Sequence, residues 1–223
     1  ARFGDGNNSS YGPLTSLDVV GHEFAHGVTQ FTANLRYRNE SGALNESFSD
    51  IFGTAIELWA SPELGDWLVG EDFTMNGAHP FRNMADPNRE DHPDTYKGEH
   101  WESGTADNGG VHTNSGVQNY WFYLLTSGGS GRNDNNVNYS VNAFGLDTAG
   151  AIAFRNLKYY LVRLSEYADA REGSMQAAED IYGPCSPAYF EVVNAWYAVG
   201  VGKLLFPFDL KTIAILEPGT LSC

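Results

Sequence analysis

The sequence contains 223 residues with a formal net charge of −15, a length that suits one large domain or two small ones. Such acidity argues against nucleic acid or an anionic membrane surface as a partner, and it suits an extracellular protein whose carboxylates are available to cations. Two cysteines, Cys185 and Cys223, are too few for a disulfide scaffold, and the sequence leaves their bonding open. No apolar run approaches the ~20 residues of a transmembrane helix.

A helix is predicted over residues 16–31, after a Gly/Asn/Ser-rich stretch over residues 1–15. This helix carries an HExxH motif that begins at His22. Histidines four residues apart lie on one helical face, so His22 and His26 can bind one metal ion, and Glu23 is close enough to hydrogen-bond a water on that ion. HExxH also arises by chance in unrelated helices, so the motif alone leaves a catalytic and an incidental interpretation open.

A second helix is predicted over residues 43–60, after a connector over residues 32–41 that contains Tyr37. Three of its carboxylates share one face: Glu46, Asp50 and Glu57. A stripe of this kind is commonly a solvated surface. However, apolar residues crowd the same helix and predict that it is largely buried: Leu44, Phe48, Ile51, Phe52, Ile56 and Trp59.

Buried carboxylates need partners, and antiparallel packing of the two helices would provide them. In that arrangement Glu46 completes a zinc site with the two histidines, and Asp50 orients His22 through its outer ring nitrogen. Glu57 then lies near Asp18, one turn before His22. Two imidazoles, one carboxylate and an open fourth position are a common catalytic zinc set, so zinc is favoured over other metals.

The rest of the chain predicts a mainly α domain with one long irregular insert. The insert covers residues 61–111, which are polar and punctuated by Gly and Pro, as is typical of segments that bind ions or carry function. Residues 112–200 form a helical bundle around a Gly/Asn loop. The predicted helices and loop are 113–127, 128–142 (loop), 146–165, 170–181 and 187–199.

Three segments carry a family resemblance: HEFAHGVT, GALNESFSD and DNGGVHTNSG resemble the signature blocks of the thermolysin-like metalloendopeptidases. The resemblance covers nearly the whole chain and implies the helical C-terminal lobe of such a protease over residues 1–202. It also implies that the family's β-rich N-terminal lobe is largely missing, with a remnant in residues 1–15. Residues 203–223 are predicted to be a linker or the start of a truncated downstream module, with an extended stretch over residues 210–216.

The resemblance assigns catalytic roles beyond the metal ligands. Glu23 is expected to be the general base that takes a proton from the zinc-bound water. His112 and Tyr37 are expected to stabilise the oxyanion, and Asp107 to orient His112. Without the resemblance, the Asp-Asn-Gly-Gly segment before His112 would indicate only a turn.

The resemblance also implies a substrate site. Arg82 and Asn45 match residues that hold the substrate backbone, and Val19 and Phe81 match the lining of a pocket for a bulky hydrophobic side chain after the scissile bond. The alternatives are a surface Arg82 paired with Asp86, and an ordinary core role for the apolar pair.

A structural calcium ion is expected on hard oxygen donors near the start of the first helix. The candidates are Asp18, Glu57, Asp66 and Glu71. Family members with two adjacent calcium ions carry an acidic residue where this chain has Leu68. One ion is therefore expected, and Leu68 can offer only its carbonyl oxygen.

These features predict a secreted zinc-dependent endopeptidase with one catalytic zinc and one structural calcium, acting on proteins or peptides. The expected partners are its own N-terminal lobe and a propeptide, and attachment to a cell surface through a downstream module is left open. A non-catalytic adhesion module is disfavoured because every catalytic and ligand residue is present. An aminopeptidase would need an acidic site for the substrate's free amine, and no such motif is found.

Overall fold

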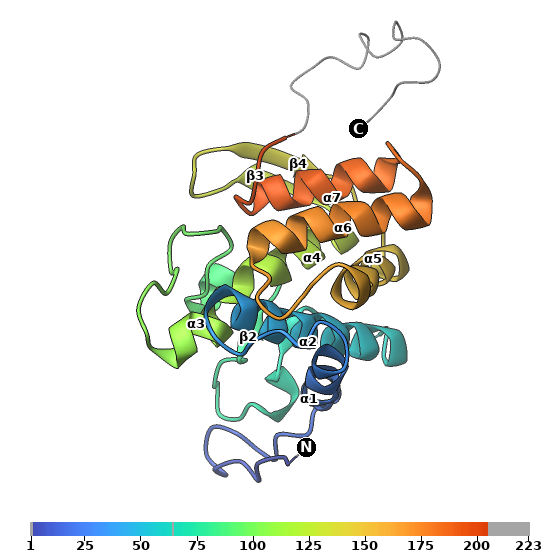
Figure 1. Ribbon diagram of the computed structural model, residues 1–223. Helices are drawn as coiled ribbons and strands as arrows, with labels where there is room; N and C mark the ends of the chain where they lie inside the picture. The colour runs from blue at the N-terminus through green and yellow to red at the C-terminus, as the bar shows by residue number, and fades with distance from the viewer. Residues whose placement is uncertain (1, 64, 205–223) are drawn as a thin grey trace, which may run out of the picture.

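The computed structural model describes residues 2–63 and 65–204. This part of the chain is mainly helical, as predicted, with two short antiparallel strand pairs (Figure 1). None of the helices described is both long and apolar enough to cross a bilayer. The extended stretch predicted over residues 210–216 lies outside the described residues.

Helices α1 (Leu17–Gln30) and α2 (Asn39–Ala60) pack side by side and antiparallel. Two glycines allow their backbones to approach closely. A Cβ atom on Gly21 would lie 2.9 Å from the Cα atom of Gly53, and a Cβ atom on Gly53 would collide with the backbone oxygen of Asp18. This contact brings the histidines of α1 within reach of the carboxylates of α2.

Helix α2 is buried over residues 41–51 but not at its C-terminal end. Trp59 is 79% exposed and Ile56 is 42% exposed, so the prediction that these two residues are buried was wrong. The reason lies in the helix pair: α1 begins at Leu17, near the level of Gly53, and does not cover the last turns of α2. The helix also begins at Asn39, four residues before the predicted start, so the connector is shorter than expected.

The predicted irregular insert contains four short regular elements. Strands β1 (Leu68–Val69) and β2 (Arg82–Asn83) pair antiparallel, with Val69 opposite Arg82. The 3-10 helices η1 (Glu71–Phe73) and η2 (Pro87–Glu90) complete the set. Strand β2 is buried, which places Arg82 against α2.

Five helices form the rest of the bundle: α3 (Asp107–Asn114), α4 (Gly116–Ser127), α5 (Leu146–Tyr159), α6 (Tyr167–Tyr182) and α7 (Pro187–Ala198). Trp121 of α4 and Trp196 of α7 are stacked in the core with ring centroids 4.8 Å apart. Helix α3 is bounded from Asp107, inside the predicted insert, but Asn108, Gly109 and Gly110 have positive φ, so regular right-handed helix runs only from Val111.

Two predictions about the bundle were wrong. Helix α5 ends at Tyr159 and not at residue 165, because the Ser165 hydroxyl accepts the backbone N–H of Val162 at 3.0 Å and closes a turn in place of another helical turn. The predicted 128–142 loop contains a hairpin of β3 (Gly129–Arg132) and β4 (Asn138–Val141). Strand β3 is wholly exposed, so its sequence lacks the alternation of apolar and polar residues that reveals a half-buried strand.

Candidate metal centre and active site

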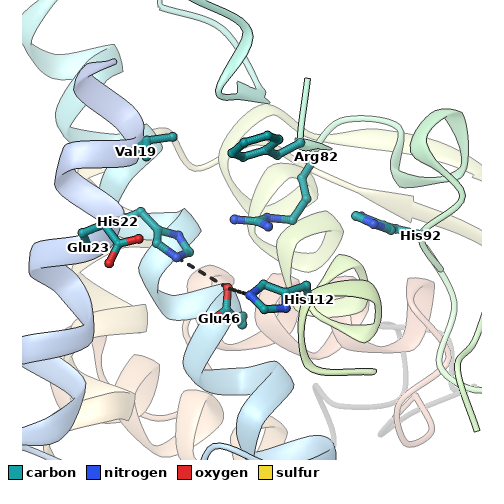
Figure 2. Close-up of a pocket in the computed structure, with 8 residues that line it drawn as sticks. Val19, His22, Glu23, Glu46, Arg82, His92 and His112 are labelled. Atoms are coloured by element: carbon teal, nitrogen blue, oxygen red, sulfur yellow. Dashed lines mark ion pairs between the residues drawn. The ribbon is translucent and has the colours of Figure 1, made fainter. Parts of the chain in front are cut away.

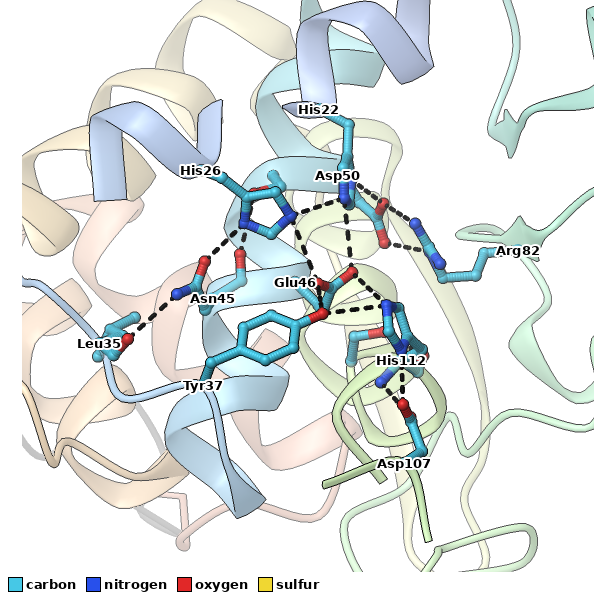
Figure 3. Close-up of polar contacts among 12 residues, drawn as sticks. His22, His26, Leu35, Tyr37, Asn45, Glu46, Asp50, Arg82, Asp107 and His112 are labelled. Carbon is cyan, nitrogen blue, oxygen red and sulfur yellow. Dashed lines mark hydrogen bonds and ion pairs between the residues drawn. The ribbon is translucent and has the colours of Figure 1, made fainter. Parts of the chain in front are cut away.

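His22, His26 and Glu46 surround one point between α1 and α2, here called the metal point (Figure 3). Their ligand atoms all lie within 4.8 Å of one another. The two Nε2 atoms are 3.1 Å apart, and each lies about 3.5 Å from an oxygen of Glu46: 3.5 Å for His22 and 3.4 Å for His26. Glu46 Oε2 is buried and has no hydrogen-bond partner among the described residues. Two imidazole nitrogens and an unsatisfied carboxylate oxygen directed at one point fit a zinc ion.

Residues of helix α2 orient both imidazole rings through contacts with their Nδ1 atoms, on the side away from the metal point. His22 Nδ1 lies 2.8 Å from Asp50 Oδ1. His26 Nδ1 lies 2.8 Å from Asn45 Oδ1 and 3.1 Å from Ser49 Oγ. When Nδ1 donates to these oxygens, Nε2 carries no proton and its lone pair is free for a metal.

Asp50 is the centre of a buried charge network. Its carboxylate accepts two hydrogen bonds from Arg82, at 2.6 and 2.7 Å, and one from Asn119 at 2.7 Å. Burial alone would raise the pKa of Asp50, but Arg82 and His22 hold that pKa well below its usual range, so the carboxylate stays ionised. Arg82 is buried and pairs with Asp50, so the alternative of a surface pair with Asp86 was wrong.

Tyr37 and His112 face the metal point from outside the two helices (Figure 3). The Tyr37 hydroxyl donates a short hydrogen bond to Glu46 and lies 3.0 Å from His112 Nε2. Burial, with the carboxylate of Glu46 beside it, raises the pKa of Tyr37, so the phenol keeps its proton. On the other side of His112, Nδ1 lies 2.7 Å from Asp107 Oδ1, and the backbone N–H donates to Asp107 Oδ2.

The backbone between Asp107 and His112 explains this geometry. Asn108, Gly109 and Gly110 all have positive φ, a left-handed turn that glycine adopts without strain. The turn folds the Asp107 carboxylate back onto the imidazole. Burial would raise the pKa of Asp107, but His112 lowers it below the ordinary value, so an ionised carboxylate holds the ring.

A pocket of about 380 Å³ opens beside the metal point (Figure 2). Eight residues line it, and all but His92 were predicted as site residues: Val19, His22, Glu23, Glu46, Phe81, Arg82, His92 and His112. Glu23 is exposed to this pocket and has no hydrogen-bond or ion-pair partner among the described residues. Phe81 also packs on Phe73, with ring centroids 5.1 Å apart, so it serves the core and the pocket together.

One member of this lining, His92, was not predicted from the sequence. It lies in the irregular insert, between Asp91 and Pro93, with no motif or periodicity around it. No pattern in the sequence could have indicated its position, because its place depends on how the insert folds over α4.

An acidic cluster occupies the other end of the α1–α2 pair. Oxygens of Glu57, Glu71 and Asp72 lie within 4.8 Å of one another. Asp18 Oδ2 accepts a hydrogen bond from the backbone N–H of Gly70 at 2.5 Å. The negative charge of Asp66 also acts on Glu57 and contributes to its raised pKa. Asp72 directly follows Glu71 in the 3-10 helix η1 and was not among the residues predicted to bind calcium.

Charge repulsion is strong within the acidic cluster. Burial first, and then the neighbouring carboxylates, raise the pKa of Glu57 to about 8 and that of Glu71 to about 7. Each of these two residues has a buried carboxylate oxygen without a hydrogen-bond partner among the described residues. Converging oxygens with unsatisfied negative charge fit a hard cation such as calcium.

An HExxH helix that faces a glutamate on an antiparallel helix defines the class of zinc metallopeptidases to which the fold and the site belong. The chain belongs to the thermolysin metallopeptidase family. Residues 33–201 match the family model described as "Thermolysin metallopeptidase, alpha-helical domain", and residues 1–30 match "Thermolysin metallopeptidase, catalytic domain". The predicted helical lobe of a thermolysin-like protease is therefore confirmed.

Individual relatives agree with this family. The chain is 45% identical to the thermostable neutral protease NprT of Geobacillus stearothermophilus over 204 residues, which are 89% of this chain and 35% of that protein. It is 38% identical to the transglutaminase-activating metalloprotease of Streptomyces mobaraensis, over 97% of this chain and 28% of that protein. The chain thus spans about a third of the length of these relatives.

Among solved structures, the chain resembles the precursor of protealysin, a metalloproteinase from Serratia proteamaculans. The TM-score is 0.74 at 31% sequence identity, and the match covers 90% of this chain and 62% of the other.

Proposed function

We propose that the protein is a zinc-dependent endopeptidase. The observation that carries this proposal is the convergence of His22, His26 and Glu46 on one point beside a pocket that also exposes the free carboxylate of Glu23. Zinc, when bound by these three residues, would supply a Lewis acid that polarises the peptide carbonyl and lowers the pKa of water.

Glu23 would act as the general base and then as the general acid. Its carboxylate would take a proton from the attacking water and deliver it to the nitrogen of the leaving amine. Support for this role comes from its exposure in the pocket and from the lack of any partner among the described residues that would occupy its oxygens.

Tyr37 and His112 would stabilise the negative charge on the carbonyl oxygen. Both groups already lie beside the metal ligands, and the Tyr37 O–H would turn from Glu46 to the carbonyl oxygen as the charge develops. The two groups lie 3.0 Å apart, and the raised pKa of Tyr37 keeps its hydroxyl protonated. Asp107 would keep His112 oriented through the 2.7 Å contact with Nδ1.

Arg82 and Asn45 would hold the substrate backbone. The Arg82 side chain is anchored on Asp50 through two of its five N–H donors and still lines the pocket, so its other N–H donors would be available to a substrate carbonyl. Asn45 donates one amide N–H to the Leu35 carbonyl and accepts from His26, which leaves a second N–H for substrate.

Val19 and Phe81 support a preference for a bulky hydrophobic residue directly after the scissile bond. Both line the pocket beside His22, and apolar walls favour an apolar side chain. A library of peptides should be cleaved mainly before Leu or Phe. A profile dominated by charged residues at that position would contradict the assignment.

The acidic cluster would bind one structural calcium ion. Glu57, Glu71 and Asp72 offer converging oxygens, and Asp18, Asp66 and the Leu68 carbonyl are further candidates. Titration calorimetry should find one tight site at this cluster.

We further propose that the protein is secreted, that it acts with an N-terminal lobe, and that it is made with a propeptide. The acidic surface charge supports an extracellular location, and the structural likeness to a precursor supports the propeptide. Attachment to a cell surface stays an open prediction.

Hydrolysis of casein by the zinc-loaded protein, with and without a zinc chelator, tests the main proposal. A non-catalytic adhesion module would give no hydrolysis in either condition. Peptides with a blocked N-terminus separate the remaining alternative, because an aminopeptidase needs a free amine and an endopeptidase cleaves them. Failure to cleave blocked peptides would contradict an endopeptidase.

A further inference from the structure

One side chain in the pocket has no part in the chemistry described above. His92 lines the same pocket as Glu23 and His112 but belongs neither to the metal ligands nor to the oxyanion donors. In Figure 2 its ring is directed toward Arg82, on the side of Arg82 and His112 away from Glu23 and His22. His92 and the metal-binding histidine His22 therefore lie on opposite sides of Arg82 in the pocket lining.

The backbone holds His92 in a defined place. Its N–H donates to the Pro87 carbonyl at 3.1 Å, and the preceding residue, Asp91, takes a left-handed conformation with φ of 56°. Gly116, the first residue of α4, permits a close contact from behind. A Cβ atom there would lie 2.6 Å from the Pro93 carbonyl and 3.2 Å from the His92 Cβ. The segment that contains His92 and Pro93 thus packs against the first residue of α4, and this contact fixes the position of the His92 backbone.

The ring of His92 is free to bind a partner. Neither of its nitrogens makes a hydrogen bond or an ion pair with any residue that the structure describes. Burial, and then the positive charge of Arg82, lower the pKa of His92 to about 4. At neutral pH the imidazole is therefore neutral, with one donor and one acceptor on a ring that lines the pocket.

The surrounding charges favour an uncharged partner. The two cationic candidates beside His92 already have their own carboxylates: Arg82 is paired with Asp50, and His112 with Asp107. A negatively charged substrate side chain would lose water here without gaining a free cation, which is unfavourable. A positively charged one would face Arg82, whose charge already lowers the pKa of His92. An amide or hydroxyl would meet a matching donor and acceptor.

We propose that His92 is a specificity-determining residue that recognises an uncharged hydrogen-bonding side chain, such as Asn, Gln, Ser or Thr, at the second residue after the scissile bond. Val19 and Phe81 take the first residue, and His92 lies beyond Arg82 from the metal point. This inference rests on the proposed peptidase function and adds a second specificity position to it.

The test compares two blocked peptides that differ only at that second position, where one carries Asn and the other Leu. The readout is the ratio of their kcat/KM values on one zinc-loaded preparation, because that ratio does not depend on how much of a variant is folded. His92→Phe keeps a ring and removes both hydrogen-bonding groups, and His92→Gln restores a donor and an acceptor. His79→Phe is the matched control, since His79 is exposed and pairs with Glu90 outside the pocket.

We expect the Asn/Leu ratio to fall about 3- to 10-fold in His92→Phe, the size of one neutral hydrogen bond, to recover in His92→Gln, and to stay unchanged in His79→Phe. An unchanged ratio in His92→Phe would overturn the inference while the peptidase function stands. A loss in His92→Gln equal to that in His92→Phe would also overturn it, because it would indicate packing and not hydrogen bonding. If the unsubstituted protein cleaves neither peptide, the proposed function falls, and the inference falls with it.

Discussion

The same pair of helices builds two clusters of opposite electrostatic character. At the metal point, the carboxylates of Glu46 and Asp50 lie among histidines, an arginine and a tyrosine. At the acidic cluster, Glu57 and Glu71 face only other carboxylates, and the described part of the chain provides no lysine or arginine that pairs with them.

The two clusters differ in whether the fold can hold their side chains in place without a bound ion. Opposite charges and hydrogen bonds fix the side chains of the metal point before any ion arrives, so it is pre-organised for chemistry. Like charges at the acidic cluster repel one another in a partly buried setting, so that end of the helix pair depends on a cation from solution. We therefore expect changes at the first cluster to alter catalysis or core stability, and changes at the second to alter calcium binding and the stability of the calcium-free protein without altering the chemistry.

The largest effect should come from the same conservative substitution made at each end. Glu23→Gln should lower kcat by ~10²–10⁴-fold, because a general base is lost while the ligands are untouched. Glu57→Gln should leave the initial rate nearly unchanged. Peptide hydrolysis and zinc content by metal analysis measure both outcomes. Loss of stoichiometric zinc in Glu23→Gln would show that the assigned roles are wrong.

The next effect concerns core stability at the metal point. Asp50→Ala should lower the free energy of unfolding by ~3–5 kcal/mol, because it leaves Arg82 buried without its counter-ion. Urea unfolding should be measured with zinc chelated in both proteins, so that lost zinc binding does not contribute. The control is Asp180→Ala, which removes an exposed partner of Arg155 and should have almost no effect. Equal midpoints for Asp50→Ala and the unsubstituted protein would contradict the buried network.

Removal of calcium should have a smaller effect on stability and almost none on the chemistry. Binding to the folded state alone contributes about 2.7 kcal/mol when calcium is at 100 times its Kd. Chelation of calcium, with zinc kept saturating, should lower the melting temperature and speed self-digestion while the initial rate is retained. An initial rate that falls in proportion to the calcium removed would place calcium in the catalytic step.

The smallest effect is a pH dependence that only the calcium-free protein should show. Glu57 and Glu71 have a pKa of about 8 and about 7 in the folded protein, against an ordinary 4.5. Between pH ~5 and ~8 the folded state therefore holds protons that the unfolded state has lost, so stability falls as the pH rises. We expect a decline in melting temperature on the order of a few °C across this window. Saturating calcium, or Glu57→Gln, should flatten the decline, and an equally steep decline in both would contradict the cluster.

Helical periodicity and motif spacing were enough to predict the helical fold and the residues of the metal point. The four-residue interval of HExxH places His22 and His26 on one face whatever surrounds the helix, and the burial of α2 required a partner for Glu46. Turn chemistry was less informative. The β3–β4 hairpin inside the predicted 128–142 loop was not recognised from the sequence, because an exposed Gly/Asn-rich strand has no apolar face.

The sequence by itself therefore determined what depends on neighbours along the chain: the mainly helical fold, the two histidines on one face, and the acidic character of the α1–α2 pair. Only the tertiary structure decided which distant groups meet, such as Arg82 with Asp50, Asp72 with Glu57, and His92 with the pocket. The physical reason is that Arg82, Asp72 and His92 lie in the predicted 61–111 insert, whose sequence has no hydrophobic periodicity. Their places depend on packing against helices and on charge neutralisation between residues far apart in the chain.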